Sequence, residues 1–488
     1  MSLLRKVKSL LLSQRRKDAN ISYSIFSIHT IFSIRTILSI RSILINYTII
    51  LGILCICFSA LPVTEARAQE ILTLQKALAT GLKNNYSIIL QNNEEQIAKN
   101  NNTIGNAGFL PSLELTAAQN NTISTTHQEQ FSGTTKDVSN ALNNNLNISA
   151  LLTWTLFDGM KMFVNKQMLG VLEDLGQNGA RIVVEGTVAD ISLTYYGIIQ
   201  LHKLVHVAQD AVDLSMQRKR IAEAKLSLGA GSQLMLLQST VDLNADSTRL
   251  IQQMVSLANT RADMNRLLAR DIFTDFEIRD TIIIKEPQGF DTILRKASLQ
   301  NTQLIAARLN QDLARLSVKQ AQADRYPQID FDGGYSYSTL NSQTGFLQFN
   351  RSYGPSFGFS LSYNLFNGFN VNRAVKNAKI LMNSGEIEVK DAMEELKVSL
   401  LKQYNQFRSN LEVVQLQLSN VIVARENVSI AFEKYQLGSI NDIELREIQQ
   451  KLIDAEYQLI SSQFVCKTAE IQLLRLSGEL LKQAPIEN

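Results

Sequence analysis

Histidine and acidic side chains at helical spacing are the first candidates for chemistry in this chain of 488 residues. His202 and His206 are four residues apart and Asp210 follows after four more, so all three would share one helical face. Imidazole and carboxylate groups placed in this way can bind a metal. No matching motif supplies a further ligand, and His202 also continues the apolar 3-4 spacing of its helix. The sequence therefore predicts no metal site.

Nucleotide-binding motifs are also absent from the sequence. Gly229-Ala-Gly231 is too short for a dinucleotide loop, and it follows a helical pattern rather than a strand. There is no P-loop and no catalytic constellation. The sequence thus predicts neither an enzyme nor a cofactor, and any energy source would belong to a partner.

Carboxylates are concentrated after Gly438, in the run Tyr435-Gln-Leu-Gly-Ser-Ile-Asn-Asp442-Ile-Glu444-Leu-Arg-Glu447. Several copies of such carboxylates around a narrow axis would favour cations and repel anions. A solvated helical turn with ordinary charges would have the same composition. The residues alone leave both interpretations open.

The N-terminal segment has the order of a secretory signal. Residues 1–42 are basic and repetitive, residues 43–61 are apolar, and Ala66-Arg67-Ala68 is a small-x-small cleavage pattern. We expect cleavage after Ala68, with residues 1–68 as the leader. The apolar run is also about as long as a short membrane helix, so an uncleaved anchor is the alternative.

The basic charge of the chain belongs to this leader. Residues 1–68 hold nine of the 48 Lys and Arg residues and two of the 45 Asp and Glu residues, which leaves 39 basic and 43 acidic residues, a net charge of −4. This balance gives no case for nucleic-acid binding. Cys466 is the one cysteine that remains after cleavage, and its helical surroundings predict buried packing rather than a disulfide.

Internal repetition organises the rest of the chain. Trp154-Thr-Leu-Phe-Asp-Gly159 recurs 209 residues later as Tyr363-Asn-Leu-Phe-Asn-Gly368, and Leu228-Gly229 recurs at the same offset as Leu437-Gly438. Pro111 and Pro327 are 216 residues apart, and a loop can absorb the difference of seven. The chain is therefore predicted to be a tandem duplication.

Each half begins with a predicted β-hairpin after its proline. Apolar residues alternate with small polar ones, as in Ile329, Phe331, Gly333, Tyr335 and Tyr337, which indicates strands with one apolar face. Residues 121–145 and 340–352 are rich in Asn, Ser, Thr and Gln, and we expect them to connect the strands. The strands are also rich in aromatic residues, as transmembrane β-barrels are. Four strands cannot close a barrel in lipid, so closure requires several chains.

Each half continues with a very long helix. Residues 159–228 and 368–437 are both 70-residue stretches without proline, long enough for helices of about 105 Å, and each ends at a glycine. Shorter helical patterns follow at 232–268 and 441–476, and others precede the prolines at 86–108 and 303–324. Two offset apolar stripes on the second long helix would let it pack a neighbour on each side, as in the wall of an α-barrel.

In this order and duplication, the proline–hairpin–Leu-Phe-x-Gly units and the Leu-Gly turns resemble the TolC-like outer-membrane efflux proteins, over residues 70–480. The resemblance implies an all-α fold with a β-barrel portion, in which three copies form a 12-stranded barrel in outer-membrane lipid. It also implies a 12-helix tunnel with a large periplasmic part. A periplasmic adaptor and an inner-membrane pump are the implied partners, with no nucleic acid, in efflux or type I secretion.

The resemblance also suggests functional residues. Glu444 and Glu447 match the acidic residues of the family's periplasmic aperture, near Asp442, and Tyr435 matches a tyrosine that helps to hold the closed state. The turns at Leu228-Gly229 and Leu437-Gly438 match the sites where adaptors dock. At two positions the sequence departs from the family pattern, so we expect closing contacts of a different composition: Ile440 replaces an arginine, and the run after Gly231 lacks a carboxylate.

The sequence thus predicts a passive duct opened by its partners. The alternative is a structural or adhesive coiled-coil protein anchored in the outer membrane, which would explain the helices but not the aromatic hairpins. The predicted segments are a leader (1–68), first upper helices (69–110), a first hairpin (111–157), a first helix pair (158–270), an equatorial segment (271–300), a second upper helix (301–325), a second hairpin (326–367), a second helix pair (368–478) and a tail (479–488).

Overall fold

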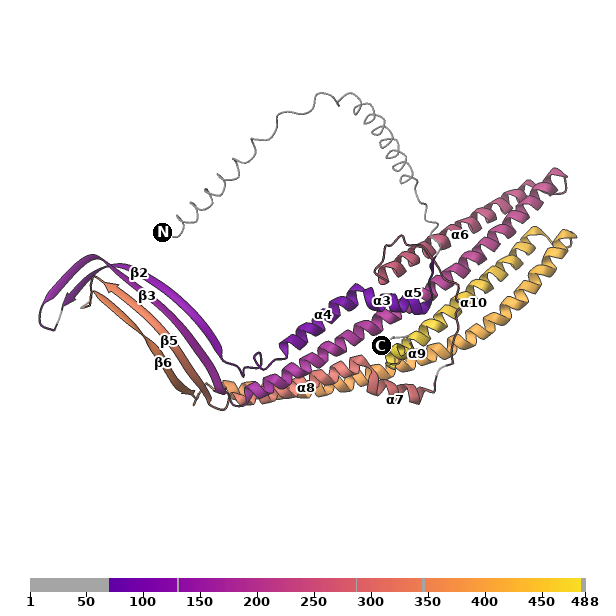
Figure 1. The fold of residues 1–488 in the computed structure, drawn as a ribbon. Helices are drawn as coiled ribbons and strands as arrows, with labels where there is room; N and C mark the ends of the chain where they lie inside the picture. Colours follow the sequence, from indigo (N-terminus) through magenta and orange to yellow (C-terminus); the bar gives the residue numbers. More distant parts are fainter. Residues whose placement is uncertain (1–69, 130, 287, 345–346, 484–488) are drawn as a thin grey trace, which may run out of the picture. The chain divides into compact units, whose positions relative to one another are not determined.

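The computed structural model describes residues 70–129, 131–286, 288–344 and 347–483. The predicted signal and its cleavage site lie outside the described residues. All the described elements belong to one compact unit that begins at residue 69. It consists of long antiparallel helices and one four-stranded sheet, as the sequence predicts (Figure 1).

The elements occur in two successive sets of the same order. The first set is α3 (Leu74–Asn84), α4 (Tyr86–Asn101), β2 (Ser112–Glu129), β3 (Thr135–Phe157), α5 (Lys161–Ser227) and α6 (Gln233–Leu267). The second is α7 (Phe290–Gln300), α8 (Thr302–Ala323), β5 (Gln328–Ser342), β6 (Phe349–Ser362), α9 (Asn370–Gln436) and α10 (Asp442–Leu476). Both long helices have 67 residues and both shorter partners have 35. Three short elements complete the described chain: β1 (Glu70–Ile71), β4 (Phe276–Glu277) and α11 (Leu480–Gln483).

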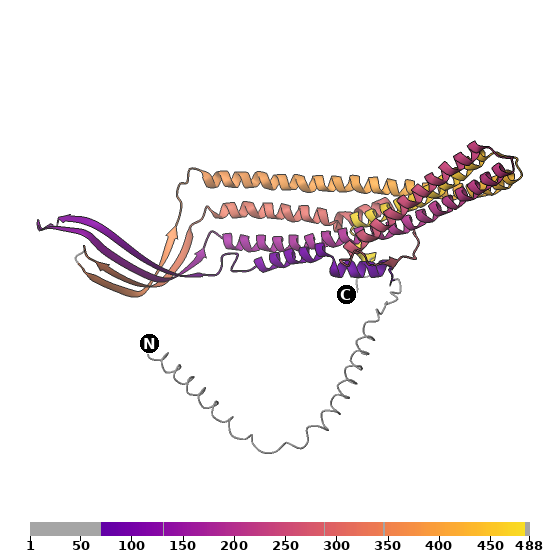
Figure 2. The same ribbon diagram turned by 90° about the horizontal axis from the view of Figure 1, so that it is seen from above.

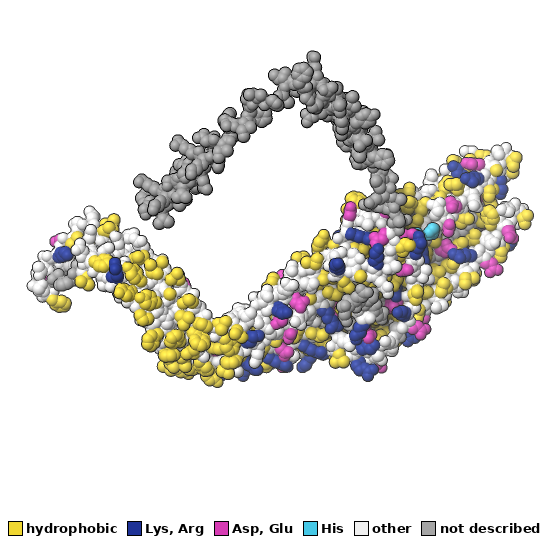
Figure 3. Space-filling model, viewed as in Figure 1, with side chains coloured by type: hydrophobic (Ala, Val, Ile, Leu, Met, Phe, Trp, Pro, Cys, Tyr) yellow, Lys and Arg dark blue, Asp and Glu magenta, His cyan; other side chains and the backbone are white. Residues whose placement is uncertain are grey.

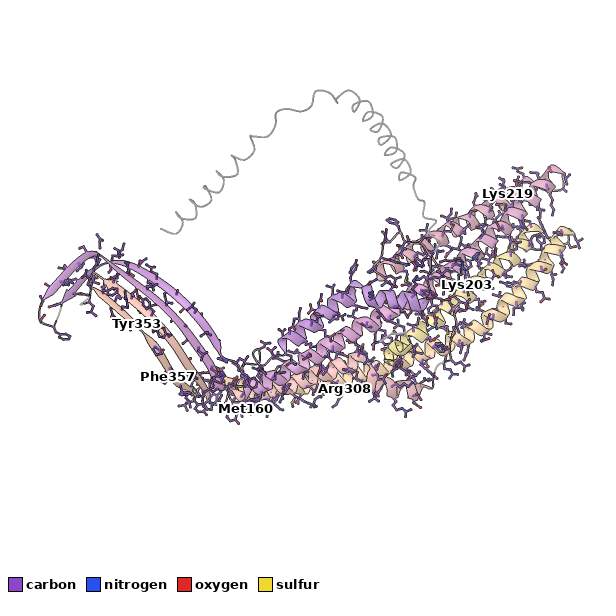
Figure 4. All side chains as sticks on the ribbon, in the orientation of Figure 1. Met160, Lys203, Lys219, Arg308, Tyr353 and Phe357 are labelled. Carbon is purple, nitrogen blue, oxygen red and sulfur yellow. The ribbon has the colours of Figure 1, made fainter. Side chains whose placement is uncertain are left out.

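The sheet has the order β2-β3-β5-β6, and all of its neighbours are antiparallel. The register places Trp154, Phe331 and Phe359 side by side on one face, and Thr153 and Asp332 on the other. Tyr353 and Phe357 are exposed on the same face as Trp154, on the edge strand β6 (Figure 4). The outer strands β2 and β6 each leave one edge without a partner strand within the described residues.

The predicted strand connections were wrong in extent. β2 continues to Glu129 and β3 begins at Thr135, so most of 121–145 is strand rather than loop. In the second hairpin β5 continues to Ser342 and β6 begins at Phe349, inside the predicted loop 340–352. Polar composition indicates only that a side chain is exposed, whereas strand pairing depends on backbone hydrogen bonds and continues through pairs such as Asn121 and Asn144.

A left-handed backbone turn joins each hairpin to its long helix. Gly159 and Met160 both have φ of 72°, and Gly368 and Phe369 have φ of 66° and 64°. A Cβ atom on Gly159 would lie 2.4 Å from the carbonyl oxygen of Ala323, so this position requires glycine for space as well as for conformation.

The helices nearest the sheet run side by side, with α4 against α5, α5 against α8 and α8 against α9 (Figure 2). The shorter helices α6 and α10 pack on their long partners at the other end. Two asparagines stack the short helices end to end. Nδ2 of Asn85 donates to the carbonyl oxygen of Leu267 at the end of α6, and Nδ2 of Asn301 donates to that of Leu476 at the end of α10, at 2.8 and 3.0 Å. The side-chain oxygens of the same asparagines cap α4 and α8.

The core consists of apolar clusters along these rods. One cluster contains Ile191, Ile198 and Met264, and a second contains Leu400, Phe407 and Leu473. Cys466 lies in the second cluster, where burial raises the pKa of its thiol to about 11. Among the described helices, a window of α5 has the mean hydropathy of a membrane span, 1.3, but half of that window is buried against its neighbours, as in a core helix.

Candidate functional site at the paired helix turns

Two similar turns close the helical hairpins at the end away from the sheet. At the first, the N–H of Ala230 donates to Lys225 and that of Gly229 to Leu226; at the second, Ser439 donates to Lys434 and Gly438 to Tyr435. This pattern is the Schellman motif, which satisfies the last carbonyl groups of a helix. Gly229 and Gly438 have φ of 73° and 74°, the left-handed conformation that the motif requires. Both turns leave their leucines, Leu228 and Leu437, 82% exposed.

The helix that follows each turn begins with a side-chain cap. Ser232 accepts the backbone N–H of Met235, and Asn441 accepts that of Glu444. In the second turn the Glu444 carboxylate also accepts the backbone N–H of Asn441 at 3.1 Å, which completes a capping box. Glu444 is therefore held at the start of α10 by the backbone that it caps.

Tyr435 is buried beneath the second turn, with 1% of its surface exposed. Its hydroxyl lies 3.4 Å from Oδ1 of Asp442, and the Lys225 ammonium lies over its ring, 4.1 Å from the centroid. Burial and the adjacent Asp442 carboxylate raise the pKa of Tyr435 to about 12. The tyrosine thus stays protonated and ties the end of α9 to the start of α10.

A buried arginine joins the first hairpin to the second. Arg218 on α5 is 1% exposed, and its guanidinium donates to both oxygens of Asp442 on α10, at 3.2 and 2.8 Å. It also donates to Asp242 on α6 at 3.0 Å. Burial alone would lower the pKa of Arg218, but the hydrogen bonds and charges of the two aspartates outweigh it and raise the pKa. The cation is therefore fixed between three helices.

A second arginine links the hairpins in the opposite direction. Arg446 on α10 donates two hydrogen bonds to the buried carboxylate of Asp246 on α6, at 2.9 and 3.1 Å. Ser215 on α5 donates to the same carboxylate. We call Ser215, Arg218, Asp242, Asp246, Asp442 and Arg446 the ionic cluster. Removing one partner from a buried pair leaves an uncompensated charge and costs about 3–5 kcal/mol.

A cavity of about 510 Å³ lies beside the ionic cluster, between the starts of α6 and α10. Its polar wall includes Arg218, Asp242 and Arg446. Leu234 and Ile443, which also line it, are more than 70% exposed. The two helical hairpins thus contact each other through the buried ionic cluster, and their apolar side chains Leu234 and Ile443 remain exposed at the surface.

The predicted site residues are in different surroundings. Tyr435 and Asp442 contact each other, whereas Glu444 is engaged in its capping box and Glu447 is exposed. The Lys451 ammonium, 2.8 Å from Glu447, lowers the pKa of that carboxyl. Ile440, at the first departure from the family pattern, packs against the cluster formed by Ala431, Tyr435 and Leu445.

The ionic cluster was not predicted, apart from Asp442. A signal was present, because its charged residues interrupt the 209-residue repeat. Arg218 corresponds to Asn427, and Arg446 corresponds to Leu237. The aspartates 242, 246 and 442 correspond to Lys451, Ala455 and Gln233. Charged residues that occur in just one of the two repeats therefore indicate contacts that are not part of the repeated pattern.

The histidine pair lies on the exposed side of α5. The rings of His202 and His206 meet edge to face with centroids 4.8 Å apart. Burial, His206 and Arg261 lower the pKa of His202. Within the residues that the structure describes, no three His, Cys, Asp or Glu side chains are grouped so that they could hold a metal ion.

The sequence is similar to known outer-membrane proteins. The profile of the family "Outer membrane efflux protein" matches residues 293–479. Outer membrane protein TolC of Escherichia coli (strain K12) is 25% identical over 217 residues, which are 40% of this chain and 44% of that protein. Alkaline protease secretion protein AprF of Pseudomonas aeruginosa is 24% identical over 296 residues, 58% of this chain and 60% of that protein. The chain thus spans less than half the length of the TolC relatives that it matches.

The fold is similar to that of a solved channel. The structure of the Campylobacter jejuni CmeC outer membrane channel superposes with a TM-score of 0.71 at 13% identity and covers 83% of this chain and 85% of that chain. The duplicated hairpins and matched helix pairs occur in the order that the sequence resemblance implies. Residues 293–479 thus match the outer membrane efflux protein family, and the chain as a whole is similar in fold to outer membrane channels of the TolC-like kind.

Proposed function

We propose that the protein is a passive export duct, in which three copies form one channel through the outer membrane and the periplasm. The observation that carries this proposal is an open four-stranded sheet with one apolar face, joined directly to two 67-residue helices. In a single chain the sheet does not close into a barrel, and the helices do not enclose a tunnel.

The sheet requires further strands if it is to stand in lipid. The edges at β2 and β6 would expose unpaired backbone groups to hydrocarbon, which costs several kcal/mol per group. β2 and β6 run in opposite directions, so β6 of one copy can pair with β2 of the next in the same antiparallel pattern. Three copies give a barrel of about 12 strands, with the Trp154 face toward lipid and the Asp332 face toward water.

The helices give the duct its length. At about 1.5 Å per residue, a 67-residue helix is about 100 Å long. Three copies arranged around one axis give a tunnel wall of 12 helices at any level, with α6 and α10 continuing α4 and α8 through the asparagine joints. A tunnel of this length suits passage across the periplasm rather than across the membrane alone.

We propose that the paired turns form the gated end. Three copies of Glu444 and Glu447 would place acidic rings near the axis and favour cations. The ionic cluster would hold the two hairpins of each chain together in the closed state. Opening then requires that Arg218 and Arg446 part from their aspartates, a change that only a bound partner would make favourable.

The partners are a periplasmic adaptor and an inner-membrane pump, which supply the energy. The exposed leucines Leu228 and Leu437 beside the turns are the proposed adaptor contacts, since apolar side chains exposed at a helical tip can be covered by a second protein. One relative is named for protease secretion, and the family whose profile matches residues 293–479 of this chain is named for efflux. Both polypeptides and small solutes are therefore candidate cargo.

Single-channel conductance in a planar bilayer tests this function. The wild type is compared with Glu444→Gln/Glu447→Gln and with Arg218→Gln/Arg446→Gln. We expect a small, cation-selective conductance in the wild type, weaker selectivity in the first variant, and a larger conductance in the second. Asn427→Ala, the repeat counterpart of Arg218, is the matched control and should conduct as the wild type does.

Each outcome separates a different part of the proposal. Unchanged selectivity in the glutamate variant would remove the acidic rings but leave the duct. An unchanged conductance in the arginine variant would show that the ionic cluster does not hold the gate. A folded trimer that never conducts, in the wild type or in either double variant, would favour the alternative of a structural or adhesive coiled-coil protein.

A further inference from the structure

Lysine and arginine residues gather where the helices leave the sheet. Residues 158–166, 316–326 and 367–383 together hold seven basic side chains and only two acidic ones, Asp158 and Asp324, whereas the chain after residue 68 is acidic overall. We call these seven the basic collar: Lys161, Lys166, Lys319, Arg325, Arg373, Lys376 and Lys379. In Figure 3 dark blue side chains lie on the helices next to the apolar surface of the sheet and its junction.

The collar is weakly neutralised by its own chain. Arg373, Lys376, Lys379 and Lys319 are exposed and make no ion pair with any described residue. Arg325 donates to the amide oxygen of Asn372, and Lys166 contacts that of Asn102. Only Lys161 has a carboxylate partner, Asp324, at 2.9 Å. At least four cations therefore remain available to an outside anion.

Helix stability does not explain these cations. The start of a helix carries a partial positive charge, so acidic residues stabilise it and lysines there are unfavourable. α9 nevertheless has Arg373 in its first turn, with Lys376 and Lys379 in the turns that follow, and it has no acidic residue before Glu386. Neither long helix has a side-chain N-cap, but Asp158 before α5 accepts the N–H of Met162, whereas its counterpart before α9, Asn367, carries no charge. The long helix of the second repeat thus begins with three exposed cations and no carboxylate.

The basic collar lies next to the exposed apolar side chains of the junction between the sheet and the helices, within a short distance along the helix axis. Leu365, Phe366 and Phe369 are each more than two-thirds exposed at the start of α9, and Met160 is exposed at the start of α5 (Figure 4). Arg373 and Lys379 follow Phe369 by four and ten residues, about 6 and 15 Å along the helix. The polar headgroup layer on each side of a bilayer is about 5–8 Å thick. Long basic side chains can extend several ångströms toward it from below.

We propose that the basic collar binds the anionic headgroups of phospholipids in the periplasmic leaflet of the outer membrane. The inference rests on the proposed orientation of the sheet in that membrane. The apolar junction fixes the depth of the barrel in the hydrocarbon layer, and the collar meets phosphate groups immediately below it. A neighbouring copy would bring few negative charges to the collar, because residues 158–166, 316–326 and 367–383 contain only two carboxylates, Asp158 and Asp324.

Lipid binding to the purified trimer tests the proposal. The protein in mild detergent is titrated with phosphatidylglycerol or with phosphatidylethanolamine, and bound lipids are counted by native mass spectrometry. The wild type is compared with Arg373→Gln/Lys376→Gln/Lys379→Gln. The matched control, Lys397→Gln/Lys402→Gln/Arg408→Gln, removes the same charge from the same helix far from the junction. Lys376→Gln/Lys379→Gln is a milder variant in case the triple change prevents assembly.

We expect the wild type to prefer phosphatidylglycerol, and the triple collar variant to lose this preference by a factor on the order of a hundred, since each of the three cations near an anionic surface contributes roughly fivefold. The control should keep the preference, and raising the salt concentration should weaken it. An unchanged preference in the collar variants overturns the proposal. Dissociation of the trimer with unchanged lipid binding also overturns it and assigns the cations to contacts between copies.

The conductance experiment distinguishes this failure from failure of the duct. The collar variant should still conduct, because its changes are far from the paired turns. If the collar variant loses its lipid preference but conducts as the wild type does, both proposals are supported. If the wild-type trimer prefers phosphatidylglycerol but never conducts, the collar proposal is supported and the proposed duct is contradicted.

Discussion

The two repeats have the same long helices and similar turns, but they differ in the charged side chains that lie beside the turns. Ile191 and Leu400 are both fully buried at corresponding positions, as are Ile198 and Phe407 within 2%. Asn85 and Asn301 make the same two contacts in each copy. At the turns, by contrast, Arg218, Asp242 and Asp246 come from the first repeat and Asp442 and Arg446 from the second. Duplication preserved what builds a straight helix pair, and divergence produced the charges that join one pair to the other.

The shared core should give the largest effects, and in both copies. Phe407→Ala removes a buried aromatic side chain and is expected to cost about 3–5 kcal/mol of stability. Ile198→Ala at the corresponding position should cost about 2–5 kcal/mol. Thermal unfolding of the two purified variants, followed by circular dichroism, measures both. A large effect at only one position would break the equivalence of the two cores.

Substitutions in the ionic cluster should have the next largest effect, and the corresponding positions of the other repeat should show none. Arg218→Met leaves Asp242 and Asp442 buried without their cation, a loss of about 3 kcal/mol. Amides near the turn at Gly438 should then exchange with solvent about a hundredfold faster, because each 1.4 kcal/mol is a factor of ten. Asn427→Ala should leave their exchange unchanged. Equal acceleration by both substitutions would mean that the repeats are alike at this end as well.

The asparagine joints should show smaller but matched effects. Asn85→Ala and Asn301→Ala each remove a helix cap and a hydrogen bond to the end of the short helix of the same repeat, α6 or α10, which together are worth about 1–3 kcal/mol. The midpoints of thermal unfolding should fall by similar amounts, and the double variant should be additive because the sites are in different repeats. Strong non-additivity would instead indicate that the two stacks are coupled.

The smallest effect concerns a glutamate that is buried in one repeat only. Glu185 is 2% exposed, and burial raises its pKa above the ordinary 4.5, although Arg181 opposes the shift. The corresponding Glu394 is exposed. Because the folded pKa is higher than the unfolded one, wild-type stability falls as the pH rises through the folded pKa. Glu185→Gln should therefore raise the unfolding midpoint at pH 7 by roughly 1–2 °C.

Lowering the pH checks the sign of this effect. The advantage of Glu185→Gln should shrink as the pH falls and should vanish below the unfolded pKa of 4.5, where the wild-type carboxyl is protonated in both states. Glu394→Gln, the control, should show little change at either pH. An advantage that grows on acidification would contradict the assignment of burial as the cause.

Sequence patterns predicted the parts of the fold that depend on local physics. Proline-free stretches and the terminal glycines located the long helices to within a few residues, because helix ends are decided by nearby residues such as Gly229 and Gly438. The strand lengths were underestimated, since Asn121 and Asn144 pair through backbone groups that composition does not reveal. At the turns, Tyr435 and Asp442 are seven residues apart and could be associated from the sequence. Arg218 and Asp442 are 224 residues apart, and only the packing of the two hairpins brings them together.

The equal lengths of the helices limit where the gene can gain or lose residues. Adding one residue to α5 alone would displace its turn by about 1.5 Å and rotate all following side chains by about 100° relative to α10, so that Arg218 would no longer face Asp442. Insertions in the rods are therefore tolerated only as matched events in several helices. The seven-residue difference between the repeats lies between Pro111 and Gly159 on one side and Pro327 and Gly368 on the other, within the hairpins. Residues can thus be gained or lost in the hairpins without disturbing the register between the long helices.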